Sequence, residues 1–205
     1  MKQIGFVVVL ALGMLVTAVA DAQTAVRLRG TITAVEGNTL SVRSREGENL
    51  ALQMPDNVAV AVAKAVKFED IKQGDYVGAA TMKQHDGSMV AIEVHYLAPS
   101  VPEGQTPWDL EPGSTMTNAK VAASVGATGG ATGGATGTRE LMLEFKGGSQ
   151  KIIVPESAAL VRAVPGTRAD LKPGEYVFAI VQKGADGKLT APRIQVSKDG
   201  VKPPQ

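Results

Sequence analysis

The chain has 205 residues, of which 44% are hydrophobic and 20% are charged, a composition typical of a packed protein rather than a disordered one. Lys and Arg total 21 against 20 Asp and Glu, so the formal charge of +1 gives no single-signed field that would attract nucleic acid, an anionic membrane or an acidic substrate. The absence of cysteine excludes disulfides, thiolate nucleophiles, cysteine-ligated zinc or iron–sulfur sites and the lipid-carrying cysteine of a lipoprotein.

The first element in the chain is a secretory signal peptide, expected over residues 1–22. One basic residue precedes a run from Ile4 to Ala20 that is apolar apart from a single threonine. Ala20-Asp21-Ala22 then places small residues three and one before a cleavage site ahead of Gln23, so we expect export to the periplasm. The alternative is an uncleaved anchor, because the run is at the lower edge of the length that spans a bilayer. No later stretch reaches that length, so we expect no stable membrane insertion once the signal is removed.

A pattern in the rest of the chain recurs at a spacing of one hundred residues. Residues 71–77, Ile-Lys-Gln-Gly-Asp-Tyr-Val, return as residues 171–177, Leu-Lys-Pro-Gly-Glu-Tyr-Val, and Asp86-Gly87 returns as Asp186-Gly187. Independent matches over that distance are improbable. We therefore interpret the chain as two tandem copies of one unit of about seventy residues.

Alternation of apolar and polar residues predicts β-strands within each unit. In the first unit the alternation covers residues 31–35, 40–44 and 50–54, with Gly37-Asn38 and Glu46-Gly47 as the turns between them.

A further run of alternating valines and alanines follows at residues 58–62. Because β-branched residues at every second position favour extended backbone, we expect a strand buried on both sides; the alternative there is a helix.

The last part of each unit is predicted to be a short turn followed by a hairpin. Residues 68–71 fit a single helical or 3₁₀ turn, which Gly74 would close as a C-terminal cap. Residues 76–82 and 89–96 lie on either side of Asp86-Gly87, a dipeptide suited to the positive φ angles of a type I′ turn. The matching features of the second unit are Gly174, the strands expected over 176–182 and 189–196, and Asp186-Gly187.

Five or six short strands with tight turns and almost no helix in each unit indicate an all-β protein. We expect two tandem small barrel-like domains of the OB or SH3 type, because closing a sheet removes its unpaired edges. An open pair of meanders packed face to face is the alternative. The expected boundaries are 26–97 for the first domain, 98–117 for a Pro-rich linker, 118–198 for the second domain and 199–205 for a C-terminal tail.

The second domain contains a Gly/Ala/Thr loop at residues 126–138. It falls where the first unit has only Gly37-Asn38, so we interpret it as an expanded hairpin loop, which costs little because loop closure grows only logarithmically with length. A phosphate-binding glycine loop would be followed by Gly-Lys-Ser/Thr and a helix, and neither follows here.

Two motifs resemble those of a known family. Residues 30–42, Gly-x-Ile-x-x-Val-x-Gly-Asn-Thr-Leu-x-Val, and residues 71–77 are similar to an exported bacterial β-domain family of unknown function, while residues 107–118 look like a two-copy subgroup of alphaproteobacteria. Proteins similar to these are sometimes labelled metal ABC transporter permeases. That label conflicts with this sequence, because a permease needs several membrane-spanning segments. The resemblance implies an exported location and a barrel-like fold, and it transfers no catalytic residue.

Histidine is the first residue type to consider for metal or acid–base chemistry, and the chain has two, His85 and His95. Across the predicted hairpin His95 lies opposite Gly78, on the order of 20 Å along the ladder from His85, too far for one shared ion. The second unit has Ala185 and Gln195 at these positions. We therefore interpret both histidines as surface or turn residues and predict no metal site and no cofactor.

Carboxylates and serine give no stronger candidate for catalysis. Asp75 and Glu175 each follow a glycine and are interpreted as turn or capping residues. Ser114 lacks the Gly-x-Ser-x-Gly elbow and a paired histidine. We predict no catalytic residue and no enzyme activity.

Trp108 is the most informative single residue, because it is the only tryptophan and lies among the prolines of the expected linker. A large aromatic side chain there either anchors one domain to the other, which we favour, or presents a surface to a ligand or partner. Trp108 and Asp109 are therefore the candidate contact residues. The residues expected to form structural turns are Gly74, Asp86, Gly87, Gly174, Asp186 and Gly187.

The sequence favours a non-enzymatic periplasmic protein that acts as a structural or protein-interaction module, with an envelope protein as its partner and no nucleic acid. The alternative is a small-ligand or metal-binding accessory protein for envelope transport, using a cleft between the domains near Trp108 and Asp109. An envelope hydrolase ranks third. The sequence does not give the oligomeric state.

Overall fold

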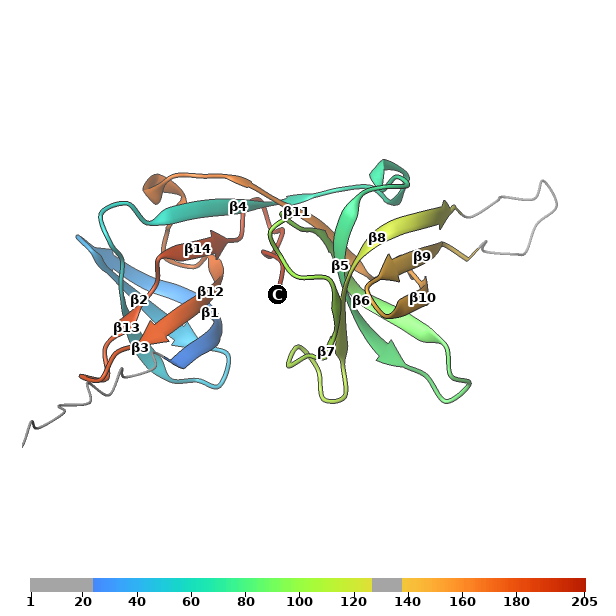
Figure 1. Cartoon of the computed structure of the whole chain (residues 1–205). Helices are drawn as coiled ribbons and strands as arrows, with labels where there is room; N and C mark the ends of the chain where they lie inside the picture. The colour runs from blue at the N-terminus through green and yellow to red at the C-terminus, as the bar shows by residue number, and fades with distance from the viewer. Residues whose placement is uncertain (1–23, 127–137) are drawn as a thin grey trace, which may run out of the picture.

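The computed structural model of the chain describes residues 24–126 and 138–205, and these residues form an all-β, barrel-like structure. The expected signal peptide and most of the Gly/Ala/Thr loop lie outside them. Figure 1 shows two barrel-like bodies side by side, joined by long strands along one edge. The first half of the chain forms β1 (Thr24–Glu36), β2 (Thr39–Ser44), β3 (Asn49–Gln53), β4 (Ala59–Ala65), the 3₁₀ turn η1 (Phe68–Asp70), β5 (Tyr76–Lys83) and β6 (Met89–Tyr96).

The second half repeats much of this order of elements. Its strand β11 and its turn η2 begin one hundred residues after β4 and η1, and β12 likewise after β5. The elements are β7 (Gly104–Pro107), β8 (Thr115–Val125), β9 (Glu140–Phe145), β10 (Gly148–Ile153), β11 (Ala159–Pro165), η2 (Arg168–Asp170), β12 (Tyr176–Lys183), β13 (Leu189–Thr190) and β14 (Arg193–Val196).

The first barrel closes by pairing strands from both halves of the chain. β1, β2 and β3 form an antiparallel meander, and β12 and β13 of the second half complete the ring. The ladder between β1 and β12 is long, running from Thr24 opposite Lys183 to Thr31 opposite Tyr176. The N-terminal meander therefore depends on a hairpin more than a hundred residues away in sequence.

The second barrel is built in the same way with the halves reversed. β8, β9 and β10 form the meander, and the hairpin β5–β6 of the first half completes it. The ring closes between β10 and β6 through a short parallel contact, in which Ile153 lies opposite Val90.

β4 and β11 connect the two barrels. They pair antiparallel with Ala63 opposite Ala163, and each also pairs with a strand of a barrel, β4 with β14 and β11 with β6. Figure 1 shows both running from one barrel to the other. The strand predicted at residues 58–62 is thus confirmed over residues 59–62 of β4, and the helical alternative is wrong. The expected burial on both sides is not found, because Ala59 is exposed and Ala61 is only partly buried.

Each hydrophobic core contains residues from both halves of the chain, because the two barrels exchange strands. The core of the first barrel contains Leu40 from the first half and Val177 from the second, both fully buried. The core of the second barrel contains Val77 from the first half and Leu141 from the second, also fully buried. Each core is therefore made of residues that neither half supplies alone.

The expected domains, residues 26–97 and 118–198, consequently do not coincide with the two barrels. β4 and β11 are extended and do not fold back, so each carries the hairpin that follows it into the other barrel. Apolar alternation identifies strands and their buried faces, but it is the same whichever matching hairpin completes the ring.

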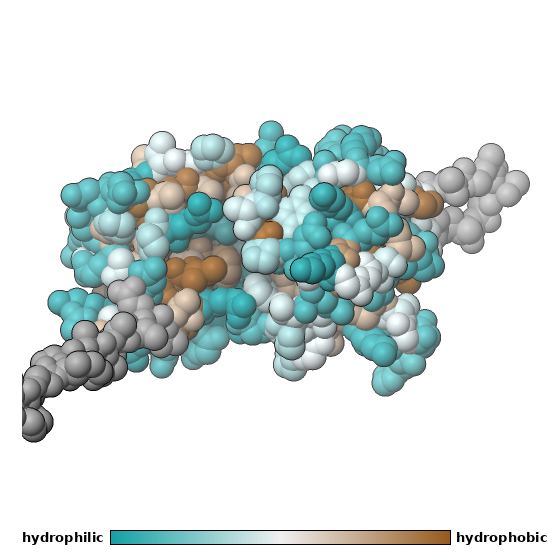
Figure 2. Space-filling model, in the orientation of Figure 1, coloured by the Kyte–Doolittle hydropathy of each residue, from teal (hydrophilic) through white to brown (hydrophobic). Residues whose placement is uncertain are grey.

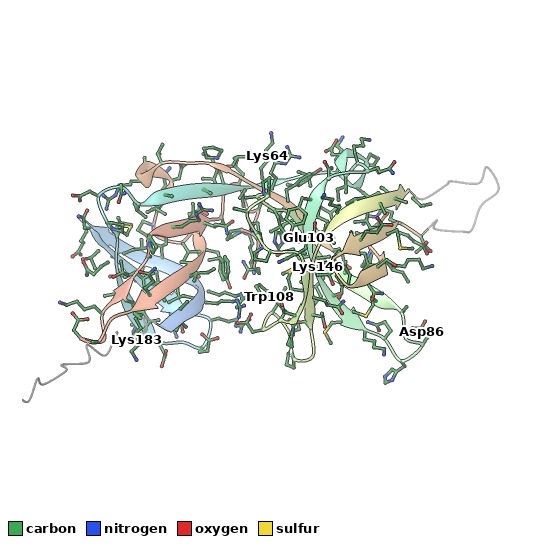
Figure 3. The ribbon with its side chains drawn as sticks, viewed as in Figure 1. Lys64, Asp86, Glu103, Trp108, Lys146 and Lys183 are labelled. Carbon is green, nitrogen blue, oxygen red and sulfur yellow. The ribbon has the colours of Figure 1, made fainter. Side chains whose placement is uncertain are left out.

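Residues 98–117 also differ from the free linker that we expected. β7 pairs antiparallel with β8, and Lys146 donates its main-chain N–H to Glu103 Oε2 over 3.2 Å, two residues that lie near each other in Figure 3. Pro107 is tolerated because β7 is an edge strand that pairs with β8 alone. This hairpin belongs to the second barrel, and Trp108 directly follows β7.

The hairpin turns lie where the dipeptides Asp86-Gly87 and Asp186-Gly187 predict them, but their type differs. Gly87 has a φ of 85° and donates its N–H to Gln84, whereas Asp86 has a negative φ. The turn is therefore a type I turn followed by a left-handed glycine, the usual three-residue hairpin, and not type I′. Gly187 has the same role, with a φ of 78°.

Gly74 and Gly174 form turns of their own and do not cap the 3₁₀ turns. η1 ends at Ile71, while Gly74, with a φ of 89°, is the third residue of a turn in which Asp75 N–H donates to Lys72. A positive φ at this position is the signature of a type II turn, which favours glycine. Gly174 has a φ of 91° in the matching turn.

Candidate functional site

The two barrels, drawn as a space-filling surface in Figure 2, flank a partly open cavity of about 520 Å³. Ala65 of β4 and Val161 of β11 lie along its base, Tyr176 belongs to the first barrel, and Glu93 belongs to the second. Residues of the tail, 199–205, also line it. We call this space the interbarrel cleft. It exists because strands of both halves meet there.

The loop that carries Trp108 reaches toward this cleft from the second barrel. Trp108 donates its main-chain N–H to Ser114 over 2.8 Å, and Ser114 Oγ donates back to the main-chain oxygen of Trp108 over 3.1 Å. Ser114 is buried by these contacts. Its hydroxyl therefore closes the loop, a structural role.

Two arginines of β1, in the first barrel, hold the loop from the other side. Arg29 donates to Asp109 Oδ1 over 2.9 Å, and Arg27 lies 4.0 Å from the other carboxylate oxygen. The Arg27 guanidinium also stacks over the Trp108 ring, 4.2 Å from its centroid. Such cation–π and charge-assisted contacts fix an aromatic side chain in place.

A third arginine, Arg45, follows β2 and donates to the main-chain oxygens of Asp109 and Leu110, each over 3.3 Å. The contacts of Trp108 and Asp109 therefore join the two barrels, as expected for anchoring residues. Figure 3 shows Trp108 between them.

Arg27, Arg29 and Arg45, which all contact Asp109, form what we call the arginine clamp. The hydrogen bond from Arg29 lowers the pKa of Asp109 below its ordinary value, and the positive charges of Arg29 and Arg27 act in the same direction. An aspartate is ionised at neutral pH in any case, and the lowered pKa keeps Asp109 ionised further into the acid range.

A buried pair of polar side chains lies on the second barrel. Glu93 and His95 are two residues apart on β6, so they share a face, and Glu93 Oε1 lies 2.7 Å from His95 Nδ1. Both are buried. His95 lies opposite Gly78, as predicted, and a β-carbon at Gly78 would stand only 2.7 Å from His95 Nε2. The glycine therefore makes room for the imidazole.

The interpretation of His95 as a surface or turn residue is thus wrong, while His85 is exposed beside its turn as expected. The face of β6 that carries His95 would be open to solvent in an isolated barrel. In the structure β11 pairs with β6, with Val161 opposite His95, and Gln205 of the tail bonds to the neighbouring Glu93. β11 lies beside β6 in the same sheet, and the contact of the tail with Glu93 helps to cover this face.

The tail enters the interbarrel cleft and binds groups of the second barrel. Gln205 donates its main-chain N–H to Glu93 Oε1 over 3.0 Å, and its main-chain oxygen accepts a hydrogen bond from Trp108 Nε1 over 3.1 Å. Pro203, Pro204 and Gln205 are all buried. Figure 1 shows this end of the chain between the barrels.

Sequence reasoning found Trp108 and Asp109 but missed Glu93 and the tail. A glutamate on a predicted strand has no distinguishing pattern. The adjacent prolines of the tail were a weak signal, because a stiff Pro-Pro segment loses little entropy when it docks.

The other acids considered as catalytic candidates have structural contacts: Asp75 holds a local turn, and Glu175 contacts the residue that follows β14. Asp75 accepts the main-chain N–H of Lys72 over 2.8 Å, and the Glu175 carboxylate accepts the hydroxyl of Ser197. In the part of the chain that the structure describes, no group of three or more His, Asp or Glu side chains is arranged to hold a metal ion. Residues 24–126 and 138–205 also include no helix that is long and apolar enough to cross a membrane.

Comparison with known proteins adds no relative. The chain matches no family profile, and a search of curated proteins gives no match either. The proposals below therefore depend on the geometry of the interbarrel cleft.

Proposed function

We propose that this protein is a non-enzymatic protein-interaction module of the bacterial envelope, exported by residues 1–22 and made of two copies of one unit. In this proposal the interbarrel cleft binds an extended segment of a partner protein. The observation that supports it is the tail, which lies in the cleft and is held through its main chain by Glu93 and Trp108.

The fixed spacing of the cleft walls supports a binding role. Both barrels share strands of both halves, and β4 pairs directly with β11 along the base. The arginine clamp on Asp109 adds a further link between them. A site whose walls are held in advance loses less free energy on binding than one that must be ordered.

The polar groups of the cleft support binding better than catalysis. Glu93 Oε1 contacts both His95 Nδ1 and the main-chain N–H of Gln205, so the most buried carboxylate and imidazole are engaged with each other and with the tail. A general base needs a free lone pair aimed at a substrate proton. Ser114 is occupied in closing its loop.

The second candidate is a small-ligand binding protein accessory to envelope transport. The cavity of about 520 Å³ favours it, because ligand sites commonly measure roughly 300–1,000 Å³. Arg45, Glu93, Glu111 and Lys202 line the cavity and provide charges of both signs.

Photo-crosslinking in living cells tests the proposed function. A photo-reactive amino acid replaces Glu111, which lines the cleft, or Lys183, which lies at the far end of the first barrel in Figure 3. We expect a discrete adduct from position 111 that mass spectrometry maps to one segment of one envelope protein, and none from position 183. Equal adducts from both positions, or none from position 111, would contradict the proposal.

A thermal-shift screen separates the second candidate from the first. A ligand that binds the native protein alone raises its melting temperature by mass action. A saturable rise with one metal ion or metabolite, and no adduct at position 111, would favour the ligand-binding alternative.

A further inference from the structure

We infer that the tail is a displaceable ligand of the interbarrel cleft, and that the partner segment has the same chemistry: an extended stretch with two adjacent prolines, followed by a residue bound through its main-chain N–H and C=O. This inference rests on the proposed function and names the class of segment that the cleft takes.

A tight turn directs the tail into the cleft. Lys198 and Val201 exchange main-chain hydrogen bonds of 3.1 and 2.9 Å, with Asp199 and Gly200 between them at φ angles of 52° and 80°. Two central residues with positive φ define a type I′ turn, which reverses the chain sharply. Lys198 Nζ also bonds to Asp170 over 2.9 Å. The chain leaving β14 is thereby turned back between the barrels.

The two prolines suit a buried and exchangeable segment. Pro203 and Pro204 are buried, and since proline has no N–H, their burial leaves no donor without a partner. Their fixed φ angles also reduce the entropy lost on docking, which is why grooves that bind extended segments commonly take proline-rich ones.

The residue after the prolines is bound through its main chain. Glu93 accepts its N–H and the Trp108 indole donates to its C=O, while the Gln205 side chain turns back to donate to the main-chain oxygen of Pro203 over 2.7 Å. In the described structure that side-chain amide makes no hydrogen bond to either barrel. Recognition therefore depends on backbone groups and on the prolines, and it tolerates other side chains at this position.

The tail is separable from the fold that holds it. Neither hydrophobic core contains a residue of the tail, and its contact with the first barrel includes the Lys202 ammonium 5.0 Å from the Tyr176 ring centroid. Removing residues 203–205 would leave both cores and every strand in place. The same cleft would then be open to a segment supplied from outside.

The experiment uses a variant ending at Lys202 and a synthetic peptide with the sequence of residues 198–205, Lys-Asp-Gly-Val-Lys-Pro-Pro-Gln. Trp108 is the only tryptophan, so its fluorescence reports directly on the cleft. We expect the truncated variant to show red-shifted emission and the peptide to reverse that shift saturably. The full-length chain should respond at least ten-fold more weakly, because its own tail occupies the site.

Three comparisons test the recognition. A peptide with both prolines replaced by alanine should bind several-fold more weakly. Replacing Glu93 by alanine in the truncated variant should weaken a dye-labelled peptide by about five-fold, the effect of one lost hydrogen bond. Replacing Glu69, which is exposed and is not among the residues that line the cleft, should leave binding unchanged.

Three results would overturn the inference: a folded truncated variant that shows no saturable response, a truncated variant that fails to fold, or equal binding of the alanine peptide. Each is distinct from failure of the proposed function. If position 111 still crosslinks to one envelope protein while the peptide does not bind, the interaction module stands and the proline-containing class of segment is wrong.

Discussion

The strand pairs β5–β6 and β12–β14 share a cross-strand register, one hundred residues apart, but carry different side chains on their outward faces. In the second barrel, Gly78 lies opposite His95, which contacts Glu93. In the first barrel, Phe178 lies opposite Gln195, and its ring is 5.2 Å from the Arg29 guanidinium.

At two positions that point into the barrels, by contrast, these strands carry the same residues in both copies. Val77 and Val177 are both fully buried, as are Ala79 and Ala179, one hundred residues apart in each case. The inward positions maintain the barrels, whereas the outward positions differ between them. The comparison teaches that the two outward faces are not equivalent, and Glu93, which lines the interbarrel cleft, is on the face that carries His95.

The largest expected effect comes from a substitution that destabilises one barrel more than the other. Leu40→Ala in β2 removes a fully buried side chain from the first core and should cost about 3 kcal/mol of unfolding free energy. Because that core includes β12, hydrogen exchange should accelerate in residues 176–183 more than in residues 76–83.

Leu141→Ala in β9 is the matched variant for the second barrel. It should accelerate exchange in residues 76–83 more than in residues 176–183. The opposite pattern in either variant would mean that each half folds on its own.

A second variant sharpens the difference between the hairpins. Gly78→Ala places a β-carbon 2.7 Å from His95 Nε2 and 3.2 Å from Asn118 Oδ1, so the imidazole must move away from Glu93. We expect the free energy of unfolding, measured by thermal denaturation, to fall by about 2 kcal/mol, a cost typical of overpacking. Phe178→Leu at the matching position should cost about 1 kcal/mol, because it keeps most of the buried volume. Equal costs would show that the two faces are equivalent.

A third variant tests the link from Trp108 to the tail. Trp108→Phe keeps an aromatic ring for Arg27 but removes the indole N–H that donates to Gln205. Unfolding free energy should fall by about 1 kcal/mol, the net value of one hydrogen bond. In the variant ending at Lys202 the same substitution should cost less. If the substitution lowers the unfolding free energy equally in the truncated variant, the indole N–H does not act through the tail.

The smallest expected effect concerns pH. The hydrogen bond from Arg29 lowers the pKa of Asp109, so the contribution of this carboxylate to stability is present above its ordinary pKa and is lost as pH falls through the lowered value. Asp109→Asn should therefore reduce stability at neutral pH by at most about 1 kcal/mol, because the carboxylate is half exposed. The difference from the unchanged protein should disappear in strong acid. A difference that grows as pH falls would contradict this assignment.

The sequence predicted the all-β class and most strand and turn positions, because these depend on local alternation and on glycines such as Gly87. It was wrong on the type of the Asp-Gly turns and on the single strand expected over 189–196, which the structure divides into β13 and β14. It also singled out Trp108 and Asp109, because an isolated tryptophan among prolines is conspicuous. It did not predict that residues 26–97 would share their core with residues 118–198, since matching hairpins carry the same inward pattern and local sequence does not distinguish the two pairings.

The binding groups of the cleft were missed for the same reason. Glu93 and His95 lie on a face that a separate barrel would expose, and the tail reaches that face from residues far away in the sequence. A polar residue on a predicted strand indicates solvent unless the partner strand is known. The tail carried two weak signals, the Asp199-Gly200 turn and the two adjacent prolines that follow it.

The central claim is that each barrel joins strands of both halves, and because the chain contains no cysteine, engineered cysteine pairs test it cleanly. Ala25 lies opposite Gln182 in the exchanged ladder, whereas barrels formed within each half would place it opposite Met82, one hundred residues earlier. Under mild oxidation, the pair Ala25→Cys with Gln182→Cys should form an intrachain disulfide, identified by mass spectrometry of the digest, and the pair Ala25→Cys with Met82→Cys should not. A disulfide in the second pair and none in the first would contradict the account.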